Sequence, residues 1–397
     1  MLTGLLLLRW LSVDSYAQYS LAFAFQKVLS VLTDLGLQGS IVALVGPRGS
    51  DPNVVGLYVR AARRIRTRAF LVSAVAAVVV FPLLTARQPW PVLDKALLCG
   101  AVVAFVWFEG GLLFGAPLLI ARRVRDYYAA KVLPAVARLG ITAVLWAAGV
   151  LSGWLAAWLA AMQTAWTARQ LRAGSASLLR EPTEIQPTVG ADFRRYLVPL
   201  LPNTIYYAFQ DQIALGIVAW VGSSRSVAEV GALGRLAQIF LFLGAANPVL
   251  VAPLLARTTR SSLPRTYGKV LLGVLLVGGL LALSGWLVPG AYLWLLGPQY
   301  AGLEGAVGWA VTAGALTLIA GTMFTMNAAR RWVFLGATLL GIAATLSTQV
   351  VLAWRLDMTT AEGAARFMAG TAASLFVGVG TAAWLGFRRE ASGPSDG

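Results

Sequence analysis

The sequence predicts an all-α polytopic membrane protein with about 12 transmembrane helices, on three observations. First, 58% of the 397 residues are hydrophobic and only 12% are charged, about half the charged fraction of a soluble domain. Second, apolar stretches of about 20 residues, long enough to span a bilayer as helices, recur along the chain. Third, 23 of the 32 Lys and Arg residues lie in every second gap between these stretches, which is the pattern of the positive-inside rule.

The apolar stretches give eleven full-length candidate helices and one short one. The full-length candidates cover residues 16–46, 69–86, 96–120, 129–150, 151–170, 194–221, 227–256, 266–289, 304–328, 332–354 and 363–387. The short candidate, residues 2–11, comes first and has about half the length of a span. The first helix is therefore expected to be short or truncated.

The alternation of charge predicts which loops face the cytoplasm. The basic gaps are 48–68, 122–131, 169–195, 257–269, 330–331 and 388–389, so the C-terminus is also expected in the cytoplasm. Within the first gap, Arg60, Arg64 and Arg68 share one helical face, which predicts a short amphipathic helix on the cytoplasmic leaflet that attracts anionic lipids. Because the net charge of +16 resides in such loops, it indicates membrane topology rather than nucleic-acid binding.

The longest polar stretch, residues 173–192, is interpreted as a cytoplasmic linker between two six-helix lobes. The predicted organisation is an N-terminal lobe at 1–172, a C-terminal lobe at 193–388 and a tail at 389–397. The lobes are expected to form a parallel pseudo-twofold repeat, because similar segments recur 208 residues apart (121–123 and 329–331) and 212 residues apart (14–19 and 226–231). By the second offset, residues 1–10 match 213–222, and about 20 residues equivalent to 192–212 would precede Met1.

Several kinds of chemistry are excluded by composition. The chain has no histidine, so a histidine metal site, catalytic triad or histidine proton relay cannot form. Cys99 is the single cysteine and lies in an apolar stretch, which excludes an intrachain disulfide and favours a packing role. No metal site or cofactor is predicted.

Short motifs in a fixed order resemble the polysaccharide-type flippases. The central segment reads DQIALGIV at 211–218 and VGALGRL at 230–236; YLVPLLPN precedes it at 196–203 and LLGPQYA follows at 295–301. Near the N-terminus, RWLS at 9–12, YAQYS at 16–20 and DLG at 34–36 fit the first two helices of that family. The chain thus resembles the O-antigen and exopolysaccharide flippases of the multidrug/oligosaccharidyl-lipid/polysaccharide exporter superfamily.

This resemblance implies a transporter that works by alternating access. The expected substrate is an undecaprenyl-diphosphate-linked oligosaccharide, flipped from the cytoplasmic to the outer leaflet of the bacterial inner membrane. Transport would be coupled to Na⁺ or H⁺. A polysaccharide polymerase and chain-length proteins are the candidate partners.

Charged residues inside the apolar stretches are the candidate functional residues, because a charge in a membrane helix is costly and usually faces a partner or water. Arg138, Arg235 and Lys27 are candidates for binding the diphosphate, since guanidinium groups in particular bind phosphate oxygens in a bidentate manner. Tyr206, Tyr207 and Asn203 are candidates for binding the sugars. Structural bridges between opposite charges remain the alternative for all the charged positions.

Three acidic residues are the candidates for ion coupling: Glu109, Asp211 and Asp34. Glu109 lies within an apolar stretch beside two glycines, and a bridge to Arg138 on the next helix is the alternative to a coupling role. Asp211 lies in a polar run with Gln210 and Gln212, where hydrogen bonding between helices is the alternative. A packing or helix-bending role remains open for Asp34.

Two other classes of function compete with the flippase. A multidrug or metabolite exporter of the same fold would favour an acidic or apolar cavity for cationic drugs. A polysaccharide polymerase or ligase would require a large outer loop with catalytic residues, and the outer loops of this chain are short. The chain is therefore predicted not to be an enzyme. The topology itself predicts that cysteines at Ser152 and Ser223 are accessible from outside and that one at Ser175 is not.

Overall fold

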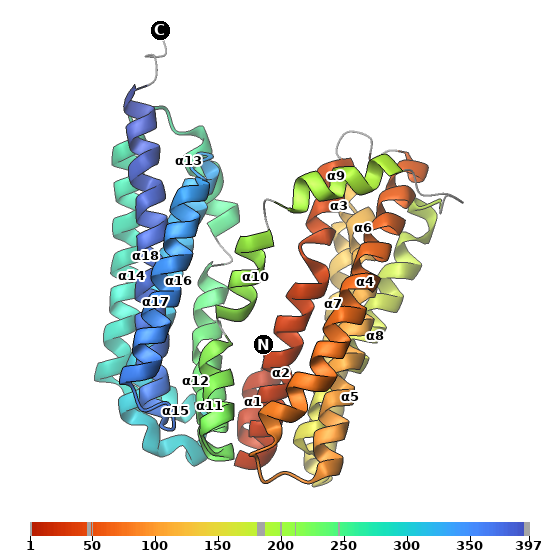
Figure 1. Cartoon of the computed structure of the whole chain (residues 1–397), viewed down its shortest axis with the longest axis vertical. Coiled ribbons are helices and arrows are strands. Elements are labelled where there is room, and N and C mark those ends of the chain that lie inside the picture. The colour runs from red at the N-terminus through yellow and green to blue at the C-terminus, as the bar shows by residue number, and fades with distance from the viewer. Residues whose placement is uncertain are drawn as a thin grey trace. The chain divides into compact units, whose positions relative to one another are not determined.

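A computed structural model describes residues 2–45, 49, 51–180, 187–198, 201–210, 212–244 and 247–392, and every regular element in these ranges is a helix (Figure 1). The chain divides into two compact units, each packed mainly within itself. The N-terminal unit comprises residues 10–220, with Leu2; the C-terminal unit comprises residues 3–9 and 221–397. Residues 193–220, which follow the predicted linker, are therefore grouped with the N-terminal helices.

The elements follow one another without strands in the described ranges. Those of residues 2–221 are α1 (Leu2–Trp10), α2 (Val13–Asp34), α3 (Leu37–Val45), α4 (Pro52–Thr85), α5 (Val92–Glu109), η2 (Gly110–Phe114), α6 (Gly115–Ile120), α7 (Val124–Ala147), α8 (Gly153–Ser175), η3 (Ala176–Leu178), α9 (Pro187–Leu197), α10 (Leu201–Gln210) and α11 (Ile213–Val221). Those of the remainder are α12 (Ser224–Gly244), η4 (Asn247–Val251), α13 (Ala252–Arg257), α14 (Leu263–Leu287), α15 (Pro289–Leu296), η5 (Pro298–Leu303), α16 (Glu304–Ala329), α17 (Leu335–Arg355) and α18 (Ala361–Ser392).

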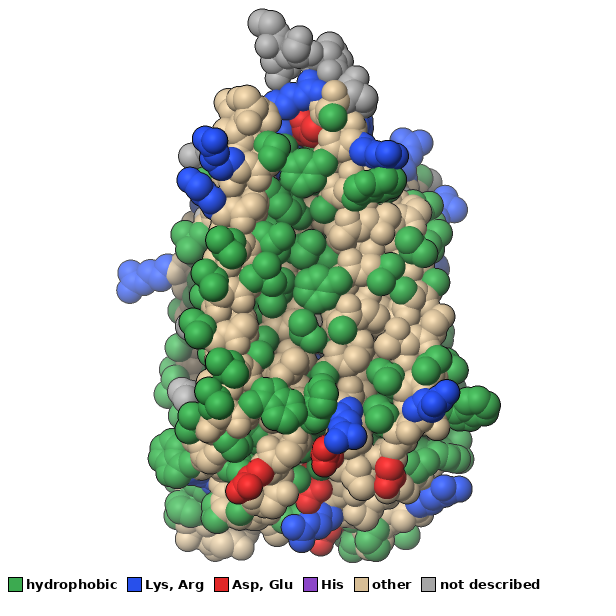
Figure 2. Space-filling view, turned by 90° about the vertical axis from the view of Figure 1, so that its left-hand side faces the viewer, with side chains coloured by type: hydrophobic (Ala, Val, Ile, Leu, Met, Phe, Trp, Pro, Cys, Tyr) green, Lys and Arg blue, Asp and Glu red, His purple; other side chains and the backbone are tan. Residues whose placement is uncertain are grey.

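Eight helical segments of the described residues are long and apolar enough to cross a membrane. They are Val13–Val42, Pro52–Thr85, Val92–Ile120, Val124–Ala147, Leu263–Leu287, Pro298–Ala329, Leu335–Arg355 and Ala361–Ala391. The outer surface of these helices is apolar: Leu276, Leu280 and Leu287 on α14 are more than half exposed. Figure 2 shows one such face, with charged side chains concentrated towards its two ends. The chain is a multi-pass membrane protein.

The basic stretch 58–68 differs from its prediction, because it does not form a separate surface helix. It belongs to α4, which continues without a break from Pro52 to Thr85. Arg64 and Arg68 are exposed, as their shared face predicts, whereas Arg66 is buried. Two residues advance a helix by about 200°, so Arg66 points to the side opposite Arg64.

Two of the candidate spans in the N-terminal unit are interrupted. The segment Val13–Val42 breaks where α2 ends at Asp34, and both Leu35 (φ 47°) and Gly36 (φ 77°) adopt left-handed backbone conformations before α3 begins. The segment Val92–Ile120 changes at Glu109 from α5 to the 3₁₀ turn η2. Irregular backbone at membrane depth persists only where it is buried in protein or lines a polar cavity, so these two breaks are candidate functional features.

The core of the N-terminal unit lies beside the first break. Leu37 and Ile41 of α3 pack with Tyr58 of α4 and with Phe193 of α9, and all four are almost completely buried. Tyr58 donates a hydrogen bond to Asp192, with a distance of 2.6 Å between Oη and Oδ2. Helix α9 is thereby anchored to α3 and α4 through apolar packing and one polar contact.

Close helix packing in the C-terminal unit depends on glycine. Gly341 of α17 and Gly378 of α18 approach so closely that a Cβ atom on Gly341 would lie 2.8 Å from the Cα of Gly378. Gly285 of α14 would place a Cβ 2.7 Å from Val311 of α16. Small residues of this kind allow helices to approach without bulk between them, which is the usual means of helix association in membranes. Figure 1 shows α14, α16, α17 and α18 running alongside one another.

The ends of the half-helices α1 and α11 are held by similar contacts. In the C-terminal unit, Gln299 donates a hydrogen bond from Nε2 to the carbonyl of Leu8 at the end of α1. In the N-terminal unit, Arg87 donates from Nη1 to the carbonyl of Trp220 near the end of α11, at 3.3 Å. Leu8 and Trp220 are 212 positions apart, and so are Arg87 and Gln299. The two contacts are thus related by the offset that the sequence predicts for the repeat.

The topology is testable with cysteines in a background in which Cys99 is replaced by alanine. Ser175 is completely buried, so the exposed Ser177 beside it is the better reporter for the cytoplasmic side. We expect a membrane-impermeant maleimide to label Ser223→Cys in intact cells and to label Ser177→Cys only after permeabilisation. Labelling of Ser177→Cys in intact cells would reverse the inside/outside assignment.

Candidate functional site

Two of the predicted coupling residues, Asp34 and Glu109, lie at the two helix breaks of the N-terminal unit. Asp34 is the last residue of α2, and its carboxylate accepts hydrogen bonds from the backbone N–H groups of Gly36 and Gln38, at the start of α3. Glu109 is the last residue of α5 and accepts a hydrogen bond from the hydroxyl of Ser30. Both carboxylates are thus positioned by the chain reversals of interrupted spans.

Arg66 of α4 lies beside the carboxylate of Glu109 and interacts electrostatically with both carboxylates. Its Nη2 atom is 3.6 Å from Oε2 of Glu109, and Asp34 is the other charge that acts on the guanidinium. Arg66 is 4% exposed. We call Asp34, Arg66 and Glu109 the charge cluster.

The break in α5 explains why a guanidinium fits here. At Gly110 the backbone N–H bonds to the carbonyls of Trp107 and Phe108, so the carbonyl of Val106 lacks the usual helical donor. Arg66 supplies one, with Nη2 at 3.1 Å from that oxygen. Gly110 leaves the necessary space, because a Cβ atom there would lie 2.5 Å from Nη1 of Arg66.

The cluster has an excess of negative charge. With both carboxylates ionised, two negative groups face one guanidinium, and the net charge is −1. An uncompensated buried charge costs several kcal/mol, so this arrangement favours the uptake of one further monovalent cation. Interrupted membrane helices with acidic and carbonyl oxygens at the break are where transporters commonly hold Na⁺ or H⁺.

The sequence places Arg66 among surface arginines, but its helical spacing from apolar residues also indicates the interior position that it occupies. The buried positions of α4 run Val59, Ala62, Arg66, Phe70 and Ser73, at spacings of three and four residues. Arg66 falls on this apolar stripe, whereas its neighbours at 64 and 68 do not. The bridge considered between Glu109 and Arg138 is not formed among the described residues, where the ion-pair partner of Glu109 is Arg66.

Arg138 and Lys27, two of the predicted phosphate-binding residues, are brought to one face of α2. Arg138 of α7 donates to Gln163 of α8 (3.1 Å) and to the hydroxyl of Tyr19 of α2 (3.4 Å). The ring of Tyr19 stacks with that of Phe23, at 6.0 Å between centroids, and Nζ of Lys27 lies 5.2 Å from the Phe23 centroid. We call Tyr19, Phe23, Lys27 and Arg138 the cation face.

The cation face has two features of a ligand surface. Lys27 is exposed in the middle of the span Val13–Val42, and a charged group at that depth faces water or a polar partner rather than hydrocarbon. In Arg138, Nε is buried and has no hydrogen-bond partner in the described structure. No carboxylate among the described residues pairs with Arg138.

The remaining predicted site residues are distributed over both units. Arg235 of α12 is buried in the C-terminal unit, where its guanidinium packs against Gly4 of α1. Tyr206 lies partly buried in α10, which packs against α2. Asp211 and the side chains of Asn203 and Tyr207 lie outside the described residues.

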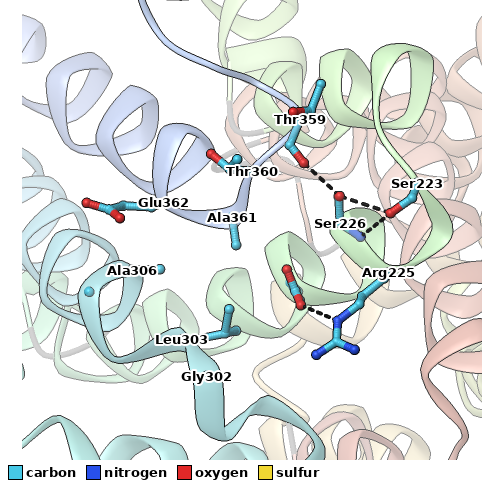
Figure 3. Close-up of a pocket in the computed structure, with 12 residues that line it drawn as sticks. Ser223, Arg225, Ser226, Gly302, Leu303, Ala306, Thr359, Thr360, Ala361 and Glu362 are labelled. Carbon is cyan, nitrogen blue, oxygen red and sulfur yellow. Dashed lines mark hydrogen bonds and ion pairs between the residues drawn. The ribbon is translucent and has the colours of Figure 1, made fainter.

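A separate pocket lies in the C-terminal unit, where three loops meet (Figure 3). Its volume is about 360 Å³, and residues 223–229, 302–306 and 359–362 line it. Its charged groups are already paired: Arg225 with Glu229 at 2.9 Å, and Glu362 with Arg366 at 2.6 Å. The hydroxyl of Ser226 donates to the carbonyl of Thr359. These contacts hold the loops together around the pocket.

The loop beside this pocket is fixed by Asp357. Thr359 donates both its hydroxyl and its backbone N–H to Oδ1 of Asp357, at 2.5 and 2.9 Å. These hydrogen bonds hold the pKa of Asp357 below its ordinary value. The carboxylate therefore remains ionised and closes the turn that leads into α18.

Comparison with known proteins identifies the fold. No family model matches the chain, and no curated protein sequence matches it. Its structure is similar to an inward-facing multidrug resistance transporter of the MATE family of the MOP superfamily (TM-score 0.72, 13% identity, covering 98% of this chain and 93% of that one). It is also similar to the lipid II flippase MurJ in an inward closed conformation (TM-score 0.65, 12% identity, covering 97% and 84%).

These likenesses extend over almost the whole chain. They show that the chain shares the fold of these two proteins, a multidrug resistance transporter and a lipid II flippase. At 12–13% identity the substrate does not follow from the fold.

Proposed function

We propose that the protein is a flippase for an undecaprenyl-diphosphate-linked oligosaccharide in cell-surface polysaccharide biosynthesis. The observation that carries this proposal is the cation face, where Lys27 and Arg138 flank the rings of Tyr19 and Phe23. Tyr19, to which Arg138 donates, and Lys27 are eight residues apart on α2, or about 12 Å along the helix axis, a spacing that suits a diphosphate and its first sugar. Guanidinium binds phosphate oxygens through paired N–H groups.

A multidrug exporter of the same fold is the second candidate function. Cationic drugs favour acidic or aromatic surroundings, and the acidic charge cluster already contains the guanidinium of Arg66. The cation face would repel such compounds. The flippase is therefore the better supported of the two.

Transport is proposed to be coupled to Na⁺ or H⁺ through Glu109 and Asp34. Support comes from the net charge of the charge cluster and from its location at two interrupted helices. Glu109 is the better candidate of the two, because Asp34 already accepts two backbone hydrogen bonds. Asp211 remains a third candidate from the sequence.

The wider organisation also remains a proposal. It comprises about twelve membrane helices, a parallel repeat of residues 1–172 and 193–388, and a cytoplasmic C-terminus in the bacterial inner membrane. The matched contacts of α1 and α11, 212 residues apart, support the repeat. The proposed partners are anionic lipids, a polysaccharide polymerase and chain-length proteins.

The function is tested by deleting the gene in its own host. We expect lipid-linked oligosaccharide to accumulate and the surface glycan to be lost, with recovery when the gene is returned. An unchanged surface glycan together with increased susceptibility to cationic drugs would contradict the flippase and favour the exporter.

The cation face is tested by Arg138→Gln and Lys27→Gln. Each is expected to lower glycan export by about 10- to 100-fold, because a hydrogen bond to a charged group contributes about 1.5–3 kcal/mol. Arg125→Gln is the matched control, since Arg125 is exposed in the first turn of the same helix as Arg138. Normal export by both variants of the cation face, at normal membrane abundance, would remove the assignment.

A further inference from the structure

We propose that Arg66 is a tethered cation that competes with the coupling cation for the charge cluster. This inference rests on the proposed coupling role of Glu109 and Asp34, and it adds a function for a residue that the transport proposal leaves unused. In this view the cluster alternates between two cations, one supplied by the protein and one by the solution. Three features support it: how Arg66 is held, what it leaves unsatisfied and what surrounds it.

Arg66 is held mainly by neutral groups. Its Nη2 atom lies 3.1 Å from the carbonyl of Val106 and 3.4 Å from Oγ1 of Thr33, both closer than the 3.6 Å to Glu109. The glycine at 110 accommodates Nη1. The guanidinium would therefore keep these anchors if Glu109 bound another cation.

One carboxylate oxygen of Glu109 accepts no hydrogen bond from the described residues in this arrangement. A direct charge-assisted hydrogen bond between a guanidinium and a carboxylate measures about 2.7–2.9 Å, and the observed distance is 3.6 Å. Oε2 of Glu109 is buried and has no hydrogen-bond partner among the described residues. A buried acceptor without a donor is costly, so this oxygen is a favourable ligand for Na⁺ or for a proton.

The surroundings of the cluster limit what else can compensate its charge. Asp34 on α2, Arg66 on α4 and Glu109 on α5 are the charges that act on one another there. Two other guanidinium groups, those of Arg63 and Arg172, lie 5.5 Å from the ring centroid of Phe114 and are not among the charges that act on Asp34, Arg66 or Glu109. Arg66 is thus the cation that sets the affinity of the cluster for a second one.

A fixed cation such as Arg66 lowers the affinity of the two carboxylates for a second cation. An opposite charge within about 4–6 Å lowers the pKa of a carboxyl group by one to three units. This is equivalent to lowering its affinity for a cation by about 10- to 1000-fold. Arg66 therefore keeps the binding of the coupling cation weak enough to be reversible. Removing it changes the net charge from −1 to −2 and makes the cation bind more tightly.

The experiment measures cation binding by thermal melting of the purified full-length protein in detergent. Na⁺ is titrated at fixed pH against choline, and pH is titrated in choline, so that the two arms distinguish Na⁺ from H⁺. For Arg66→Gln we expect the midpoint of one titration to move at least about 10-fold towards lower cation concentration. Arg64→Gln, which removes an exposed charge two residues away on α4, should leave the midpoint unchanged.

A second pair of variants keeps the test decisive if Arg66→Gln does not fold. Arg66→Lys retains the charge without the planar fork, and Gly110→Ala displaces Nη1, which lies 2.5 Å from the new Cβ position. Both should shift the same midpoint in the same direction by a smaller factor. Wild-type midpoints in folded variants, or no cation dependence in the wild type, would overturn the proposal. Because no glycan is involved, failure of the flippase assignment would not affect this result.

Discussion

Replacing Glu109 by glutamine is expected to abolish cation-driven transport while the protein still inserts into the membrane. The substitution keeps the shape of the side chain and removes one negative charge, so Asp34 alone then balances Arg66. The charge cluster becomes neutral and has no electrostatic reason to take up a further cation. The measurement is transport in proteoliposomes with and without an imposed Na⁺ or H⁺ gradient, together with the cation dependence of the melting temperature.

The control for this variant is Glu304→Gln. Glu304 is exposed in the first turn of α16, so its substitution removes the same charge without affecting a buried group. We expect its gradient dependence to match the wild type. If Glu109→Gln retained full stimulation by both gradients, coupling would have to reside elsewhere, and Asp211 would become the leading candidate.

Replacing Gly153 by alanine is expected to cause a large loss of stability. Gly153 begins α8 after the N-cap residue Ser152, and a Cβ atom there would lie 2.1 Å from the carbonyl oxygen of Ser15 on α2. Backbone atoms cannot rotate away as a flexible side chain can, so α8 would have to move. Overpacking of this kind costs about 1–3 kcal/mol or more, which a thermal melt in detergent would detect.

Gly140→Ala is a matched control with the opposite expected sign. Gly140 lies inside α7, and a Cβ atom there would meet nothing within 4 Å. Because alanine favours a helix over glycine by about 1 kcal/mol, this variant should melt at the same temperature as the wild type or slightly higher. Equal melting temperatures for Gly153→Ala and the wild type would show that the α2–α8 contact is looser than described.

The fold class could be predicted from the sequence because it depends on quantities that sum over many residues. Apolar length and the placement of Lys and Arg determine which segments lie in the membrane. The two helix breaks could not be predicted in the same way. Asp34-Leu35-Gly36 and Glu109-Gly110-Gly111 lie within stretches that are apolar enough overall to be taken for one continuous helix. Whether such a segment bends is determined by its neighbours, here Arg66 and the start of α3.

The candidate site could be predicted only in part, for a related reason. Single charges inside apolar stretches identified Glu109, Asp34, Arg138 and Lys27, because burial makes such residues rare. Arg66 lies between exposed arginines in the sequence, so the sequence pattern alone assigns it to the same surface. Its role depends on the direction in which one side chain points, and on a glycine 44 residues away that leaves room for it.

The paired contacts at Leu8 and Trp220 bear on how the two halves of the chain should be compared. Arg87, on the loop that follows α4, stacks on Trp220 of α11, at 4.9 Å from the ring centroid. In the other half the arginine is on the half-helix, where Arg9 of α1 lies 4.8 Å from the ring of Trp294 on α15. By the offset of 212, Arg87 corresponds to Gln299 and Trp220 to Leu8, so the two arginine–tryptophan contacts use different positions of the repeat. An alignment of the halves would score these positions as unrelated, so kinship between them is better sought in pairs of residues than in single columns.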